Sequence, residues 1–254
     1  MTPSVPPIFD AHFHIVDAAF PLVPNDGYVP DPFSVEDYRR ATTGLGVMGG
    51  AVVSGSFQAF DQAYLEAALA RLGPGFVGVT QLPPSVSNAE IGALDSIGVR
   101  AVRFNLVRGG SASVASLARL GRRVHEVAGW HVEVYADGRH LPALAPHLRG
   151  LPLVGLDHMG LSGAGLDHVL DHLDGGGFVK ASGFGRTADD LDVAGALARM
   201  VAVNPAGVVF GSDLPSTRAP RPFARSDVEL VTACLGEDAA ARVLGVNAVA
   251  IYRP

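Results

Sequence analysis

The chain has 254 residues, of which 48% are hydrophobic and 17% are charged, and its formal net charge is −6 at pH 7. This composition excludes a disordered chain, and the negative charge argues against a nucleic-acid partner, which would require a basic stripe. A single cysteine, Cys234, excludes an internal disulfide and a cysteine-cluster metal site, so that a metal could bind only through histidine and carboxylate groups.

Eight short apolar runs, rich in β-branched residues or glycine, recur along the chain and predict β-strands. They cover residues 8–15, 49–56, 76–82, 99–106, 130–136, 151–158, 177–183 and 207–213. None approaches the roughly 20 apolar residues that span a bilayer, and the N-terminus lacks the basic and apolar regions of a signal peptide. We therefore expect a soluble, cytoplasmic protein without a membrane partner.

Leucine and alanine recur at helical spacing between most of these runs, with glycine or proline at the ends. The predicted helices lie within residues 60–73, 113–129, 141–150, 166–174 and 191–205, and residues 227–236 are also helix-like. Alternating strands and helices indicate a parallel sheet. Eight such units in about 250 residues match an α/β fold of the (β/α)₈ TIM-barrel type, with an open doubly wound sheet as the alternative. We expect a single domain over residues 1–254.

Two histidines lie one residue apart in the first predicted strand, within the sequence IFDAHFHIVD. Because side chains alternate between the two faces of a strand, His12 and His14 share a face, and Asp10 is expected below them on that face. Taken alone, the pair could make ordinary hydrogen bonds at a strand end. The polar residues of the later strands favour a reaction centre instead.

Those polar residues recur at the carboxyl ends of the later strands, where the active sites of TIM barrels lie. They are Arg103, Asn105, Glu133, Tyr135, Asp157, His158, Lys180, Ser182 and Asp213. Because the eighth strand closes the barrel against the first, Asp213 would lie beside His12 and His14, with His158 facing them. Such a group could bind a zinc-like ion. It could also work without metal, with Asp213 as base and the imidazoles as donors to a carbonyl oxygen, so either arrangement predicts hydrolysis.

Arg103 is predicted to face into the barrel, where a guanidinium is costly unless it is paired. Its partner could be Glu133 on the neighbouring strand, which would make Arg103 structural. It could instead be a substrate carboxylate held by two parallel hydrogen bonds, and we favour this interpretation, which implies a small anionic substrate. Lys180 could be an ion-pair partner inside the barrel or a site residue. Asp157 is expected to orient its neighbours, since a carboxylate behind a catalytic histidine commonly fixes its tautomer.

An ordered series of strand-end motifs resembles one known superfamily. DAHFH, LDHMG and GSDLP, in this order, are similar to the amidohydrolase superfamily. GVRAVRFNLVRGG, WHVEVYADGRHLP and GFVKASGFGR resemble its lactonase branch, which is typified by 2-pyrone-4,6-dicarboxylate lactonase. The resemblance spans nearly the whole chain and implies a (β/α)₈ barrel in which water attacks the ester carbonyl of a ring lactone.

The resemblance also implies roles for individual residues. Asp213 would be the general base, while His12, His14 and His158 would polarise the carbonyl or position the water. Contacts to the carboxylates and ring of the substrate would come from Arg103, Tyr135, Arg186, Ser56, Tyr28 and, as a weaker match, Arg108. Ser216 stands where relatives often have histidine, which affects the identity of the substrate more than the reaction.

The resemblance leaves the metal open. Members with two metals carry a lysine or glutamate on the fourth strand and a histidine on the fifth, where this chain has Arg103 and Tyr135, so a binuclear centre is not expected. No cofactor is strictly implied, but one divalent ion such as zinc could be held by His12, His14 and Asp213. Two alternatives remain, a zinc-dependent decarboxylase of an aromatic or muconate-like acid and a barrel that binds a ligand without turnover. The oligomeric state is not indicated.

Overall fold

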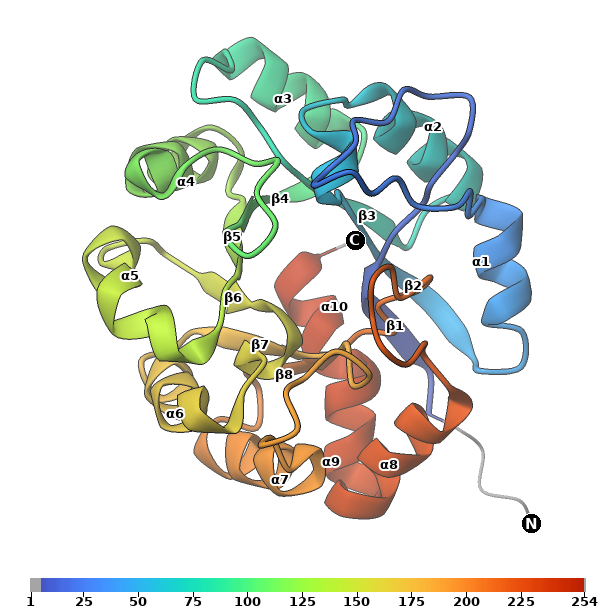
Figure 1. The fold of residues 1–254 in the computed structure, drawn as a ribbon, viewed down its shortest axis with the longest axis vertical. Helices are drawn as coiled ribbons and strands as arrows, with labels where there is room; N and C mark the ends of the chain where they lie inside the picture. The colour runs from blue at the N-terminus through green and yellow to red at the C-terminus, as the bar shows by residue number, and fades with distance from the viewer. Residues whose placement is uncertain (1–5, 254) are drawn as a thin grey trace.

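The computed structural model describes residues 6–253, and eight parallel strands form its centre (Figure 1). In chain order, and each beside the next, the strands are β1 (Ile8–Phe13), β2 (Val47–Val53), β3 (Phe76–Thr80), β4 (Val99–Asn105), β5 (His131–Tyr135), β6 (Val154–Leu156), β7 (Phe178–Ala181) and β8 (Val208–Phe210). The ring closes just beyond β8, where the Asp213 N–H donates to the His12 carbonyl oxygen at 2.7 Å. The eight predicted strands and the predicted (β/α)₈ barrel are thereby confirmed.

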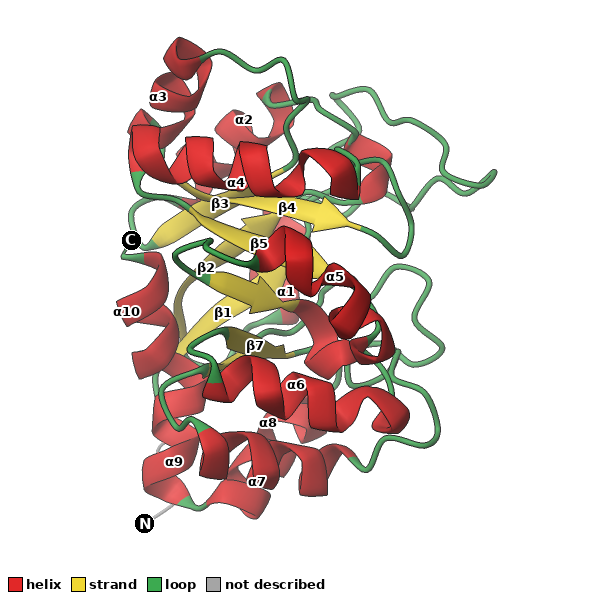
Figure 2. Cartoon of the chain, turned by 90° about the vertical axis from the view of Figure 1, so that its left-hand side faces the viewer, coloured by secondary structure: helices red, strands yellow, loops and turns green. Residues whose placement is uncertain are grey.

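Helices cover the outside of the barrel (Figure 2). They are α1 (Val35–Ala41), α2 (Ala63–Leu72), α3 (Asn88–Ser96), α4 (Val114–Ala128), α5 (Leu141–Leu148), α6 (Leu166–Asp174), α7 (Val193–Val203), α8 (Arg225–Leu235), α9 (Glu237–Ala241) and α10 (Asn247–Tyr252). The predicted helices are confirmed as α2 and α4 to α8. Within residues 6–253, no helix combines the length and apolarity needed to cross a membrane.

Helices α1 and α3 were not among the predicted elements, although both begin with a readable signal. Ser34 accepts a hydrogen bond from the Asp37 N–H, and the Asp37 side chain accepts one from the Ser34 N–H. Ser87 and Glu90 form the same reciprocal pair at the start of α3. A serine followed three residues later by an acidic residue is typical of a helix start, because the two side chains satisfy backbone N–H groups that have no partner inside the helix.

An apolar cluster fills the barrel at the amino ends of the strands. Its buried members are Phe9, Ala11, Ala51, Val53, Val77, Val79, Ala101, Phe178, Val209, Ala248 and Tyr252. Helix α10 lies at this end, where Tyr252 stacks on Phe9 with a ring-centroid distance of 5.5 Å. The tips of the strands and the long loops lie at the opposite end (Figure 2). Residues at the carboxyl ends of the strands are therefore the ones that can meet a ligand entering the barrel.

The first strand departs from the simple alternation expected of it. Asp10 pairs with Gly50 and Phe13 with Val52, so β1 uses one more residue than β2 over this stretch. Such a bulge reverses the faces of the residues that follow it. As a result Asp10 lies on the side of α1, where its carboxylate accepts a hydrogen bond from the Tyr38 hydroxyl at 3.1 Å. The prediction that Asp10 shares a face with His12 and His14 was wrong.

Candidate active site

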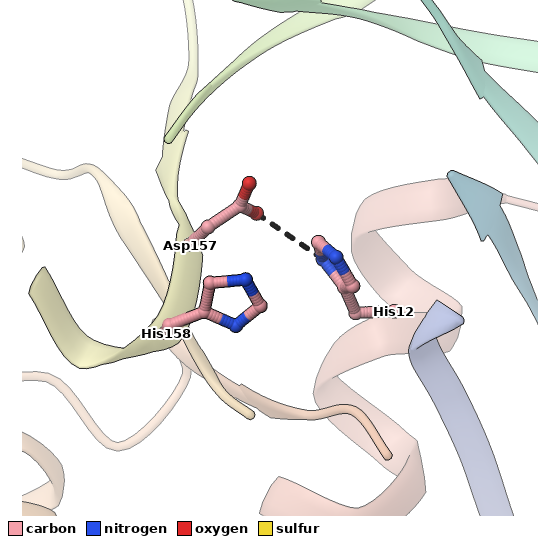
Figure 3. Close-up of side chains that lie close together, drawn as sticks. All are labelled: His12, Asp157 and His158. Atoms are coloured by element: carbon pink, nitrogen blue, oxygen red, sulfur yellow. Dashed lines mark ion pairs between the residues drawn. The ribbon is translucent and has the colours of Figure 1, made fainter. Parts of the chain in front are cut away.

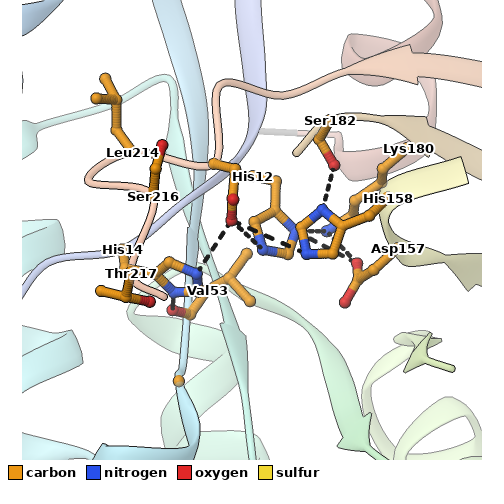
Figure 4. Close-up of polar contacts among 12 residues, drawn as sticks. His12, His14, Val53, Asp157, His158, Lys180, Ser182, Leu214, Ser216 and Thr217 are labelled. Atoms are coloured by element: carbon orange, nitrogen blue, oxygen red, sulfur yellow. Dashed lines mark hydrogen bonds and ion pairs between the residues drawn. The ribbon is translucent and has the colours of Figure 1, made fainter. Parts of the chain in front are cut away.

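Four side chains from three distant parts of the sequence converge inside the carboxyl end of the barrel, and Figure 4 labels the three histidines among them. The Asp213 Oδ1 atom lies 3.8 Å from His12 Nε2, 3.6 Å from His14 Nε2 and 3.9 Å from His158 Nε2. All four residues are buried. The structure thus brings together the residues that the sequence placed at the ends of the first, sixth and eighth strands.

The backbone turns sharply where two of these residues follow their strands. His158 has φ 52° and Asp213 has φ 60°, which is the left-handed region that residues other than glycine rarely adopt. Strand β6 ends at Leu156 and β8 at Phe210, so both side chains project from tight turns directly beyond the sheet. Strained backbone of this kind clusters at functional sites, because the surrounding structure must hold it in place.

Each imidazole has a different partner on its Nδ1 atom. His14 Nδ1 lies 2.7 Å from the Val53 carbonyl oxygen, and since that oxygen only accepts, Nδ1 carries the proton. His158 Nδ1 lies 2.9 Å from the Ser182 hydroxyl. His12 Nδ1 lies 3.3 Å from Lys180 Nζ and 3.3 Å from Asp157 Oδ1 (Figure 3). The three Nε2 atoms consequently face Asp213 while the Nδ1 atoms anchor the rings.

Burial and a guanidinium set the charge states of this group. Burial opposes ionisation of Asp213, but the Arg186 guanidinium and the nearby imidazoles offset it and hold the pKa of Asp213 below its usual range. Arg186 Nε donates to Asp213 Oδ2 at 2.7 Å, and Arg186 Nη2 contacts the same oxygen. Burial also lowers the pKa of His12 to about 3 and that of His158 well below its usual value. At neutral pH the Asp213 carboxyl is therefore ionised, and the His12 and His158 imidazoles are neutral.

Two of the converging atoms lack a hydrogen bond within residues 6–253, namely His12 Nε2 and Asp213 Oδ1. The nitrogen and oxygen donors of His12, His14 and Asp213 lie within 4.8 Å of one another. Two imidazoles and a carboxylate are ligand types that zinc prefers, so the residues fit one divalent ion. His12, Asp157 and His158 form a second such group (Figure 3).

The structure corrects the expected partner of Arg103. Its Nε atom donates to Asp157 Oδ2 at 2.8 Å, and its Nη1 atom donates to the Ser54 carbonyl oxygen at 3.0 Å. Glu133 instead forms an ion pair with Lys180. Glu133 and Arg103 are neighbours in register, but the long arginine side chain reaches another strand end. Asp157 thus contacts both Arg103 and His12.

All six predicted substrate contacts line one small pocket above the converging group. Its lining comprises His14, Tyr28, Gly55, Ser56, Phe57, Arg103, Asn105, Arg108, Tyr135, His158, Arg186, Asp213, Thr217 and Arg218. The pocket encloses about 40 Å³, and four of its residues are arginines. Ser216 is not among the lining residues, and its hydroxyl instead accepts a hydrogen bond from the Phe223 N–H at 2.9 Å.

Arg218 is a lining residue to which the sequence analysis gave no role. Its guanidinium lies 4.4 Å from the centre of the Tyr28 ring, and Nη1 donates to Asn25 Oδ1 at 3.0 Å. Asn25 Nδ2 in turn donates to the Arg108 carbonyl oxygen at 2.9 Å. These contacts hold the loop after β1 across the mouth of the barrel. The signal available in the sequence was the position of Arg218 only five residues beyond Asp213.

A much larger groove, of about 660 Å³, lies on the flank of the barrel between α5 and α6. Its walls are mainly leucine, proline and glycine, and none of the four converging residues lines it. A reaction needs groups that can move protons or stabilise charge at one point, and the small pocket supplies them. We therefore assign the candidate active site to the small pocket rather than to the groove.

Comparison with known proteins agrees with this fold. A family model described as amidohydrolase matches residues 9–253. A 2-pyrone-4,6-dicarboxylate hydrolase of Comamonas testosteroni is 31% identical over 156 residues, which is 59% of this chain and 51% of that protein. The chain thus matches about half the length of this curated relative.

Solved structures match over almost the whole chain. A structure from Agrobacterium tumefaciens has a TM-score of 0.86 at 22% identity, covering 99% of this chain and 98% of that one. A Pseudomonas putida structure reported under the name of a 2-pyrone-4,6-dicarboxylic acid hydrolase has a TM-score of 0.82 at 26% identity, covering 97% of both chains. The Agrobacterium tumefaciens structure supports the fold alone, whereas the Pseudomonas putida structure is also similar in sequence over nearly the whole chain.

Proposed function

The chain belongs to the amidohydrolase family, and from this premise we propose that it hydrolyses a small lactone that carries a carboxylate. One observation carries the proposal. An ionised, buried carboxylate faces three imidazole Nε2 atoms, directly beneath a pocket that four arginines line. The similarity to 2-pyrone-4,6-dicarboxylate hydrolases supports the same substrate class.

In the proposed reaction Asp213 is the general base. Its Oδ1 atom accepts a proton from a water molecule, whose oxygen forms a bond to the ester carbonyl carbon of the lactone. The imidazoles of His12, His14 and His158 hold that water or donate to the carbonyl oxygen as negative charge develops on it. The ring C–O bond then breaks, and the leaving oxygen takes the proton back from Asp213. The product is a ring-opened hydroxy acid.

The arginines of the pocket support an anionic substrate. Arg186 is paired with Asp213 and Arg103 with Asp157, while Arg108 and Arg218 bring two further positive charges to the pocket. A guanidinium binds a carboxylate through two parallel hydrogen bonds, which gives both affinity and orientation. We propose that Arg103, Arg108 and Arg186 contact carboxylates of the substrate. Tyr28, Ser56 and Tyr135 would contact its ring, since they line the same pocket.

A metal is compatible with this site without being required by the reaction as we write it. His12, His14 and Asp213 would hold a single divalent ion, because their donor atoms converge and two of them have no hydrogen-bond partner within residues 6–253. When bound, such an ion would polarise the carbonyl or acidify water. The roles of Arg186 and Arg103 would be unchanged.

The decisive experiment is an ester-hydrolysis screen with 2-pyrone-4,6-dicarboxylate, muconolactones and neutral aldonolactones. Purified protein is assayed before and after chelation, and its metal content is measured. We expect turnover of a carboxylated lactone and little turnover of neutral ones. Release of carbon dioxide from an aromatic or muconate-like acid, abolished by chelation, would point to the decarboxylase alternative. Binding of the whole panel without turnover would identify a ligand-binding barrel and refute the lactonase.

A further inference from the structure

Lys180 is unusual in both the sequence and the structure. It is the single lysine of the chain, against 18 arginines, and its side chain is fully buried inside the barrel on β7. Its ammonium group forms an ion pair with Glu133, lies 3.6 Å from Asp157 Oδ1 and lies 3.3 Å from His12 Nδ1 (Figure 4). The lysine therefore contacts the site through His12 Nδ1, the ring nitrogen on the side away from Asp213.

Lys180 belongs to a buried network of ion pairs and hydrogen bonds that fixes its position. Glu133, its closest partner, also accepts hydrogen bonds from the Tyr252 hydroxyl at 2.6 Å and from His131 Nε2 at 3.1 Å. Burial opposes ionisation of Glu133, but Lys180 and His131 offset it and lower the pKa of that carboxyl. The Lys180 ammonium group is thus held between two carboxylates, those of Glu133 and Asp157.

An ammonium group has three N–H donors and no lone pair, so toward His12 it can only donate. His12 Nδ1 must then present its lone pair, and the single proton of the neutral ring lies on Nε2. We propose that Lys180 is a positioning residue that fixes His12 as the Nε2–H tautomer. This tautomer makes His12 the donor to the lactone carbonyl oxygen, an assignment that rests on the proposed function.

Asp157 offers the competing arrangement, because its Oδ1 atom also lies 3.3 Å from His12 Nδ1 and could accept a proton from it. Two observations favour Lys180. The Lys180 contact has hydrogen-bond geometry, whereas Asp157 Oδ1 has no hydrogen-bond partner within residues 6–253. A proton on Nδ1 would also point toward an ammonium group 3.3 Å away.

His14 adopts the opposite tautomer, because its Nδ1 atom donates to the Val53 carbonyl oxygen. The two Nδ1 atoms therefore differ: that of His14 carries a proton toward Val53, whereas that of His12 accepts from Lys180 and leaves the ring proton on Nε2. This division suits a metal-free reaction, in which one ring donates to the carbonyl oxygen and the other accepts from water. A metal would require His12 to move its proton to Nδ1 and to lose the contact with Lys180, so Lys180 opposes metal binding.

The tautomer can be read in the wild-type protein without substrate or metal. Protein labelled with ¹⁵N-histidine is studied by long-range ¹H–¹⁵N NMR, and the variants H12Q and H14Q assign the two rings. We expect the Nε2–H pattern for His12 and the Nδ1–H pattern for His14. An Nδ1–H pattern for His12 overturns the proposal, whatever the protein hydrolyses.

A double variant tests whether Lys180 is what fixes the tautomer of His12. The double substitution Lys180→Met with Glu133→Gln removes the cation and its main partner together, so that Glu133 is not left as an unpaired buried charge, while Asp157 keeps its ion pair with Arg103. We expect His12 to switch to the Nδ1–H tautomer and zinc affinity, measured by equilibrium dialysis, to rise about tenfold, the scale on which partners of a metal-ligating histidine tune affinity. For a lactone substrate, kcat should fall about 100-fold with little change in KM.

The control is Tyr252→Phe, which removes a hydroxyl donor to Glu133 but keeps the ion pair between Glu133 and Lys180, and it should keep the wild-type tautomer and zinc affinity. A double variant with the wild-type tautomer and zinc affinity overturns the proposal. A protein that shows both tautomers as stated but opens no lactone refutes the proposed function and leaves the control of His12 by Lys180 in place.

Discussion

Two polar layers lie inside this barrel, and they differ in whether their buried groups are paired. The lower layer consists of His131, Glu133, Lys180 and Tyr252, and the upper layer of His12, His14, Asp157, His158 and Asp213. In the lower layer both carboxylate oxygens of Glu133 accept hydrogen bonds. In the upper layer His12 Nε2, Asp157 Oδ1 and Asp213 Oδ1 have no hydrogen-bond partner within residues 6–253.

Both layers are equally removed from solvent, so burial does not distinguish them. An unpaired buried polar atom costs about 1–3 kcal/mol, and a fold that keeps several of them at one point holds them ready for a ligand or a reacting water. Inside this barrel, hydrogen bonding of the buried polar atoms therefore separates the structural groups from the functional ones. The lower layer should respond to substitution mainly through stability and the upper layer through turnover, with Lys180 as the exception because its contact with His12 joins the two layers.

The largest effect is expected in the upper layer. Asp213→Asn removes the proposed base while keeping the shape of the side chain, so kcat for a carboxylated lactone should fall about 1000-fold. The unfolding transition measured by circular dichroism should remain cooperative. Asp167→Asn, which alters an exposed ion pair with Arg199, is the matched control and should keep wild-type turnover. Near-wild-type rates in the Asp213 variant would remove this residue as the base.

The lower layer should show the reverse response. Glu133→Gln leaves Lys180 without its main counter-ion in the barrel interior, so the free energy of unfolding should fall by about 3 kcal/mol. Urea denaturation measures the loss, and Glu36→Gln, in an exposed pair with Arg71, is the control with a small expected change. A free energy of unfolding equal to that of the wild type would show that the ion pair between Glu133 and Lys180 does not stabilise the lower layer.

The sequence predicted the strands well because buried parallel strands read as continuous apolar runs. It missed α1 and α3, whose serine and acidic capping residues were not weighed as helix starts. The prediction of the strand face on which Asp10 lies was wrong, because the bulge in β1 adds a residue that alternation alone does not reveal. The convergence of His12 with Asp213 was predictable, since closure of a barrel joins its first and last strands.

The two layers themselves could not be predicted. Arg103 and Glu133 face each other in register, yet Arg103 bonds to Asp157 in the upper layer while Glu133 bonds to Lys180 below. Register gives the neighbour of a residue, but the length and direction of each side chain decide which layer it joins. The contact of Lys180 with His12 depends on the same choice and has no counterpart in the sequence pattern.

Arg103 tests the division between the layers, because it is paired with Asp157 of the upper layer and also lines the pocket. If its guanidinium also binds a substrate carboxylate, Arg103→Met should raise KM for carboxylated lactones roughly 10-fold to 100-fold. KM for neutral lactones should change far less. Steady-state kinetics on one substrate of each kind makes the test. Equal effects on both would assign Arg103 to the support of Asp157 alone.

The charge state of Asp213 gives a prediction about pH. Its pKa lies below the usual range, so the base stays ionised as the pH falls, and kcat/KM of the wild type should remain level down to about pH 5. Arg186→Met removes the main favourable charge but not the burial, so the pKa of Asp213 should rise. The acid limb of the kcat/KM profile should then move upward by about one to three pH units. An unmoved limb would show that another group controls it.

The smallest effect is expected at the mouth, above both layers. Arg218→Met removes the guanidinium that lies over the Tyr28 ring and bonds to Asn25, so the loop after β1 should hold Tyr28 less firmly against the substrate. A contact of this kind is worth about 0.5–2 kcal/mol, which predicts a rise in KM of roughly fivefold with kcat nearly unchanged. Arg225→Met is the control, because Arg225 also bonds to loop carbonyl oxygens, those of Thr43 and Gly44, but does not line the pocket. A change in kcat rather than KM would place Arg218 among the groups that act on the reacting atoms, and the division between paired support and unpaired chemistry would then extend to the mouth.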